Sequence, residues 1–120
     1  MKKLFFLLIF ISTLSVAHSQ DKIESYGIQI GNWNYVTQNW DFEQLKTCNV
    51  DFIIQGNVII ANDEAKSTYY TYNFFTETET SKSWKALDEK NRECIVALSF
   101  KYNTRILSVM YDDVIYKYYY

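Results

Sequence analysis

The chain has 120 residues and a formal net charge of −2, and it is 48% hydrophobic and 18% aromatic, with three glycines and no proline. This length suits a single domain. The composition excludes collagen, proline-rich linkers and low-complexity disorder.

The first 19 residues have the pattern of a secretory signal peptide. Residues 1–3 carry two lysines, residues 4–14 are apolar, and residues 15–19 end in small side chains. This order of basic, apolar and small residues is typical of cleaved export signals. The apolar run is too short for a permanent transmembrane helix. We therefore expect a signal peptide over residues 1–19 and a single β-rich domain over residues 20–120.

Cleavage after Ser19 would make Gln20 the first residue, whereas cleavage after Ala17 would keep His18. A bacterial lipoprotein needs a cysteine at the cleavage point, and residues 15–22 contain none. The sequence thus predicts a soluble, exported protein, periplasmic or extracellular. No Asn-x-Ser/Thr sequon occurs to favour a eukaryotic exterior over a bacterial periplasm.

Removal of the signal peptide also changes the charge. Ten basic residues then face fourteen acidic ones, which leaves a charge near −4. An acidic surface disfavours nucleic acid and anionic membranes as partners. We expect no nucleic-acid partner, no stable membrane span after cleavage, and an unidentified ligand or protein partner.

In the N-terminal third of the domain, residues 26–30 and 34–37 are the first expected strands. Residues 38–48 allow two structures. Asp41 could cap a short helix in which Trp40 packs against Leu45. The alternative, which we favour because the rest of the chain has a strand pattern, is an extended segment with Trp40 and Phe42 on one face.

The middle of the chain predicts a hairpin and a further strand. Gly56-Asn57 separates two apolar runs, residues 52–55 and 58–61, and a glycine in the first position suits a type II′ turn. Residues 62–66 then turn the chain into a strand at 67–72. The polar stretch 76–83 is expected to be a solvated loop or an edge.

The C-terminal third predicts a meander. Residues 84–88 form a strand that a turn at 89–92 joins to the strand beginning at Cys94, with Asn91 at positive φ. A two-residue loop at Asn103-Thr104 would pair Phe100 with Leu107, Leu98 with Val109 and Val96 with Tyr111. A second loop at Asp112-Asp113 would pair Tyr111 with Val114, Val109 with Tyr116 and Leu107 with Tyr118. One apolar face then continues through three strands.

These segments together predict an all-β fold, a small antiparallel meander of about seven or eight short strands. Such a chain can form a barrel-like sheet or a sandwich. Sequential hairpins favour the barrel-like form, because a sandwich usually needs longer crossovers.

Most catalytic chemistry is missing. The only histidine, His18, lies at the signal peptide, so the domain has no imidazole for a Ser-His-Asp arrangement or for the usual zinc site. The acidic pairs at 63–64, 88–89 and 112–113 sit at expected turns, where Asp bonds the local backbone and acidic side chains stay solvated. We expect no metal, no cofactor and no catalytic residue. A carboxylate-based hydrolase using Asp41, Glu43 or Asp51 is the least favoured alternative.

Cys48 and Cys94 are the only thiols. In an exported protein an even number of cysteines could form a disulfide, here stabilising the domain by roughly 4 kcal/mol. The alternative is two separately buried thiols, because Cys94 already lies on the expected core face.

The eleven tyrosines and three tryptophans are the unusual feature of the composition. Exposed aromatic rings on a sheet can stack on sugars or contact a protein, although tyrosine is also simply a good strand former. Trp84 is an expected core residue. The candidate ligand-binding residues are Trp33, Trp40, Tyr70, Tyr72 and Tyr119. The expected function is a non-enzymatic binding module using an aromatic surface or barrel mouth; the alternatives are a protein-binding inhibitor and a structural subunit of an envelope assembly.

Overall fold

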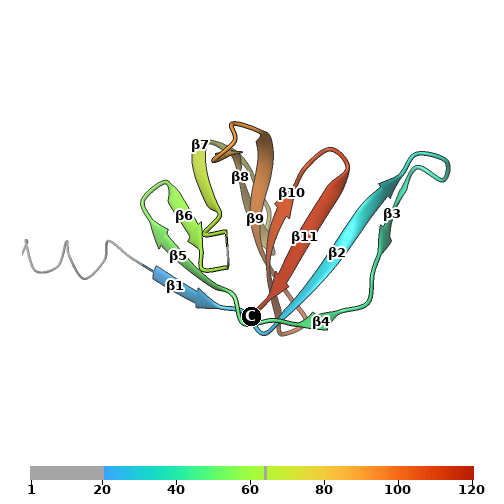
Figure 1. Ribbon diagram of the computed structural model, residues 1–120, viewed down its shortest axis with the longest axis horizontal. Helices are drawn as coiled ribbons and strands as arrows, with labels where there is room; N and C mark the ends of the chain where they lie inside the picture. The colour runs from blue at the N-terminus through green and yellow to red at the C-terminus, as the bar shows by residue number, and fades with distance from the viewer. Residues whose placement is uncertain (1–20, 64) are drawn as a thin grey trace, which may run out of the picture.

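The computed structural model describes residues 21–63 and 65–120, and the expected signal peptide lies outside this part. The described chain is all-β and forms one antiparallel sheet (Figure 1). It contains no helix long and apolar enough to cross a membrane. The strands are β1 (Asp21–Glu24), β2 (Gly27–Asn34), β3 (Asn39–Phe42), β4 (Lys46–Thr47), β5 (Asp51–Gln55), β6 (Val58–Ala61), β7 (Thr68–Glu77), β8 (Ser81–Asp88), β9 (Glu93–Lys101), β10 (Thr104–Met110) and β11 (Val114–Tyr119).

The order in the sheet is β1-β5-β6-β7-β8-β9-β10-β11-β2-β3, with β4 beside β2. The prediction of an antiparallel all-β meander is confirmed. The expected count of seven or eight strands is too low, because the chain forms eleven. All of them belong to a single sheet, which is not closed into a barrel.

The sheet curls so strongly that its inner face packs on itself. Phe52 of β5 and Tyr118 of β11 have five strands between them in the sheet, yet their ring centroids are 4.7 Å apart. Both belong to a core that also includes Ala86, Val96 and Leu107, all fully buried. We call the face that carries this core the inner face and the opposite one the outer face.

The two halves of the sheet meet where β1 passes into β2. The amide of Ser25 donates to the carbonyl of Val50, just before β5, and the amide of Tyr26 donates to the carbonyl of Tyr119 in β11. From this junction the strands fan out, with β1 and β3 at opposite sides of the molecule (Figure 1). No ladder joins β1 to β3 in the described chain, so the sheet is curled without being closed.

The C-terminal meander is confirmed in its faces and corrected in one register. Across the turn at Asp112-Asp113, β10 and β11 pair as predicted, Leu107 with Tyr118. The loop predicted at Asn103-Thr104 is wrong: β9 and β10 turn at Tyr102-Asn103, so Leu107 pairs with Leu98 and not with Phe100. Both turn residues have positive φ, as a type I′ turn requires. A shift of two residues keeps every side chain on its face, which is why the hydrophobic pattern could not detect it.

Two other turns are confirmed. Gly56-Asn57 joins β5 to β6, and Gly56 has a φ of 59°. Asn91 also has positive φ between β8 and β9. The loop expected over residues 76–83 is confined to 78–80, because β7 continues to Glu77 and β8 begins at Ser81. The alternative, a solvated edge, holds for the end of β7, which pairs with β8 and not with β6. The polar side chains there lie on a sheet that is open to solvent, where alternation with apolar residues is not needed.

The N-terminal third differs most from prediction. The expected strand at 34–37 is wrong: β2 ends at Asn34, whose side-chain carbonyl accepts from the amides of Val36 and Thr37 and starts the turn. Residues 38–48 are extended, as β3 and β4, and not helical.

Candidate functional site

The predicted site residues lie on the outer face, in two separate places. Trp33 of β2 and Trp40 of β3 are directly paired, with ring centroids 5.3 Å apart and an edge-to-face geometry. Next to them Phe42 covers Gly31, where an added Cβ would come within 2.6 Å of the Phe42 ring. The ammonium of Lys117 lies 4.2 Å from the centroid of Phe42. These contacts hold the hairpin β2–β3 onto the sheet and leave both tryptophans half-buried.

Tyr119 lies on the same face of the sheet, but its hydroxyl is already hydrogen-bonded. Its hydroxyl donates to the Gln29 side chain at 3.0 Å. Tyr70 and Tyr72 lie on β7, far from β2 in the strand order, and are 46% and 49% exposed. The structure therefore does not bring the five predicted residues into one site.

Of the two possibilities for the cysteines, a disulfide or two separate thiols, the structure has the separate thiols. Cys94 is buried in the core, and burial together with the nearby Asp88 charge raises its pKa to about 11. Cys48 is half-buried, with its sulfur 3.5 Å from the Ser25 hydroxyl.

The first hollow of the inner face is polar. It has a volume of about 350 Å³ and lies where β8, β10 and β11 reach their turns. At its centre, buried Asp88 accepts four hydrogen bonds: from the Lys90 and Arg92 amides at 2.9 Å each, from Arg92 Nε at 3.2 Å and from the Tyr111 hydroxyl at 2.9 Å. Burial alone would raise the pKa of Asp88, but these donors, led by the Arg92 amide, hold it below its usual value. Three of these hydrogen bonds close the β8–β9 turn, and the fourth joins the turn to Tyr111.

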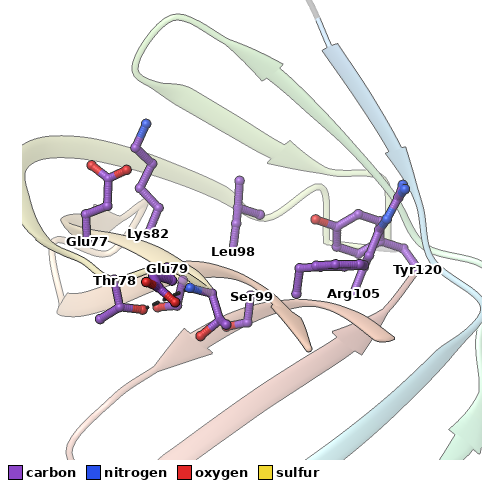
Figure 2. Close-up of a pocket in the computed structure, with 11 residues that line it drawn as sticks. Glu77, Thr78, Glu79, Lys82, Leu98, Ser99, Arg105 and Tyr120 are labelled. Atoms are coloured by element: carbon purple, nitrogen blue, oxygen red, sulfur yellow. Dashed lines mark hydrogen bonds between the residues drawn. The ribbon is translucent and has the colours of Figure 1, made fainter. Parts of the chain in front are cut away.

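The second hollow is an open groove of about 490 Å³ at the other end of the same strands, near the β7–β8 turn (Figure 2). Its lining residues come from β7 to β10 and from the chain after β11. Figure 2 shows Glu77, Lys82 and Leu98 projecting to the same side of the sheet, with Arg105 beside Tyr120 at the far end of the row. We call this hollow the inner groove.

The inner groove is open because the β5–β6 hairpin is short. The Thr71 amide donates to the carbonyl of Asn57 in the hairpin turn, and this is where the hairpin ends against β7. β7 continues for six more residues, through bulges between Thr71 and Asn73 and between Phe74 and Thr76. The inner face beyond Thr71 is uncovered, and Phe74 and Phe100 are 54% and 52% exposed there.

An apolar cleft of about 130 Å³ adjoins the inner groove under the hairpin. Ile54 and Ile59 line it from the hairpin, and Trp84 and Val96 line it from the sheet. Leu98 lines both the cleft and the groove. Trp84, a predicted core residue, is thus on the inner face but only half-buried.

Within residues 21–63 and 65–120, the cations of the inner groove form no salt bridge. None of the salt bridges among the described residues involves Lys82 or Arg105. The Arg105 guanidinium lies 6.0 Å from the centroid of the Phe100 ring. Burial raises the pKa of the Tyr120 hydroxyl, and the neighbouring Arg105 charge opposes that rise. Arg105 and Tyr120 therefore offer a guanidinium and a hydroxyl donor side by side.

Sequence reasoning missed the residues of this groove. A signal existed for Arg105, which shares the alternating face of Leu107 and Val109. Lys82 fell in the segment predicted as a loop, so its direction was not visible.

The described residues contain no group of three or more His, Cys, Asp or Glu side chains that could hold a metal ion. Comparisons with protein-family models, with curated proteins and with solved structures find no match to this chain.

Proposed function

We propose that the protein is an exported, non-enzymatic binding module that takes an apolar or amphipathic ligand into the inner groove. One observation carries this proposal: apolar side chains on the inner face stay open to solvent and continue into a cleft. Exposed Phe74 and Phe100 lie beside a cleft lined by Trp84 and Leu98. A concave apolar surface with a few polar groups at its rim is the usual form of a small-molecule site.

The residues around the inner groove support binding and not catalysis. Neither histidine nor cysteine lines it, and its two acids, Glu77 and Glu79, are both exposed to solvent. The other inner-face carboxylate, Asp88, already accepts four hydrogen bonds. A general acid or base needs a carboxyl group that is free to exchange a proton with a substrate.

The test is binding of the neutral fluorescent probe N-phenyl-1-naphthylamine. We expect its emission to rise in the presence of the protein and Phe100→Ala to weaken binding about fivefold, since a large aromatic contact is lost. Tyr72→Ala is the matched control, because Tyr72 is equally exposed but lies on the outer face. Equal effects of the two substitutions, or no binding at all, would contradict the proposal.

Export is part of the same proposal and has its own test. The intact mass of protein recovered from the exported fraction should correspond to a chain beginning at Gln20. Counting free thiols on that material decides the state of Cys48 and Cys94. A mass that retains residues 1–19 would contradict export.

A protein-binding role is the second candidate, and the outer face of β7 favours it. Tyr70 and Tyr72 are both about half exposed there, and Phe75 is 49% exposed nearby. Tyrosine gives a large contact area at little cost in side-chain entropy. The Tyr72→Ala control above tests this surface as well, once a partner protein is in hand.

A further inference from the structure

We propose that the inner groove selects amphipathic anions, with a carboxylate bound by Arg105 and Tyr120 and the apolar part lying over Leu98 toward the Trp84 cleft. This inference rests on the proposed function and adds the chemical class of the ligand. It depends on the positive charge of Arg105, which forms no salt bridge with the described residues.

The apolar path is continuous. Leu98 lines both the inner groove and the cleft, so an apolar chain that enters beside Arg105 can pass over Leu98 toward Trp84. The cleft has room for only part of an acyl chain, at about 130 Å³, and the open groove of about 490 Å³ takes the rest. Burying the methylenes of such a chain against these apolar side chains favours binding.

The polar end of the groove is Arg105. Its neighbour across the strands is Tyr120, whose amide donates to the Arg105 carbonyl at 3.0 Å, and the two side chains lie next to each other in Figure 2. No carboxylate of the described chain lies within salt-bridge distance of this guanidinium. Arginine presents a planar donor fork that matches a carboxylate, and the Tyr120 hydroxyl adds a third donor.

The opposite end of the groove is electrically different. Glu77 pairs with Lys82 in the register of β7 and β8, and both side chains project into the groove at that end (Figure 2). The two charges largely offset each other at a distance. An anion is therefore attracted to the Arg105 end, and Glu77 limits binding at the Lys82 end.

The chain contains its own reporter for this test. Replacing Trp33 and Trp40 by phenylalanine keeps both outer-face rings aromatic and leaves Trp84 as the single tryptophan of the domain. Its emission is then followed while the protein is titrated with decanoate, decanol or decylamine, each below its critical micelle concentration. The three probes share one apolar chain and differ in charge.

We expect decanoate to bind about tenfold more tightly than decanol and decylamine to bind most weakly. Arg105→Gln should weaken decanoate binding about tenfold and leave decanol binding within twofold of the wild-type affinity. Arg105→Lys should keep most of the preference for decanoate over decanol. Tyr120→Phe should weaken decanoate about threefold. Glu77→Gln should strengthen decanoate binding and leave decanol binding unchanged, because it removes a negative charge that repels the decanoate carboxylate.

The failures of the two proposals are distinguishable. Equal binding of decanoate and decanol, or an Arg105→Gln effect that is the same for both, would overturn the anion selectivity and leave the apolar groove. No change in Trp84 emission with any of the three probes would overturn the groove as a binding site. Arg105 is exposed, so its substitution should leave the circular dichroism spectrum unchanged, and this is checked for each variant.

Discussion

The two ends of the curled sheet use the same kinds of side chain in opposite ways. At the polar hollow, Arg92 and Tyr111 both donate to buried Asp88. At the inner groove, Arg105 and Tyr120 lie side by side, and no Asp or Glu of the described chain forms a salt bridge with Arg105. An arginine and a tyrosine thus close a turn at one end and remain available to a ligand at the other.

The difference follows from what covers each end. Around Asp88 the β8–β9 turn folds back over the carboxylate, and Tyr69, Tyr111 and Tyr118 line the same hollow. Burial raises the pKa of the Tyr118 hydroxyl to about 12. At the inner groove the β5–β6 hairpin stops at Thr71, and nothing in the described chain covers the sheet beyond it.

The largest expected contrast is in stability. Asp88→Ala removes an acceptor of four hydrogen bonds and should lower the free energy of unfolding by about 3 kcal/mol. Arg105→Gln breaks no bond to the rest of the chain and should change it by less than about 0.5 kcal/mol. Urea denaturation of both variants measures the contrast. Equal losses would mean that Arg105 also has a structural role.

The acid dependence of stability should come partly from Asp88. Its folded-state pKa is lowered, so its contribution is complete above the unfolded value of about 4 and is lost as the pH falls through the folded-state pKa. Urea midpoints between pH 7 and pH 2.5 should fall steeply below about pH 4 for the wild-type protein. Asp88→Asn should be less stable at neutral pH and show a shallower fall. An unchanged slope would contradict the role assigned to this carboxylate.

Tyr111 and Tyr120 should show the same contrast in stability with a smaller effect. Tyr111→Phe deletes one hydrogen bond to Asp88 and should cost about 1 kcal/mol in unfolding free energy. Tyr120→Phe deletes a hydroxyl for which no protein hydrogen bond is found in the described chain, and should be neutral within about 0.3 kcal/mol. Thermal or urea unfolding measures the stability of both variants. A larger loss for Tyr120→Phe than for Tyr111→Phe would contradict the difference proposed between the two ends.

The smallest expected effect lies at the turn that borders the inner groove. Tyr102 is 86% exposed and has a φ of 52°, a conformation that asparagine tolerates better than tyrosine. Tyr102→Asn should therefore raise the free energy of unfolding by about 0.5 kcal/mol. Its effect on decanoate binding should be nil, because Tyr102 does not line the groove. A loss of stability would show that the exposed ring packs in solution.

The C-terminal meander was the most predictable part of the fold. In β9 to β11 one face is buried throughout, so alternation reveals which side chains point inward. The loop between β9 and β10 was misplaced because a two-residue shift preserves those faces. The strands at Asn39–Phe42 and Lys46–Thr47 were harder, since they are short and mostly exposed and have little pattern to read.

The candidate site was less predictable than the fold. Aromatic content drew attention to Trp33, Trp40, Tyr70, Tyr72 and Tyr119, which all lie on the outer face. The inner groove exists because of a difference in length between the β5–β6 hairpin and β7, which depends on pairing across the sheet. The sequence around Arg105 does not show whether its guanidinium forms a salt bridge, because that depends on which side chains the folded sheet places next to it.

The most direct test of this account is chemical-shift mapping of the ¹⁵N-labelled protein during titration with decanoate. The account predicts shifts at Leu98, Phe100, Arg105 and the Trp84 indole, with the resonances of Asp88, Arg92 and Tyr111 unmoved. Shifts centred on the Asp88 end, or on the outer-face residues Tyr70 and Tyr72, would contradict it.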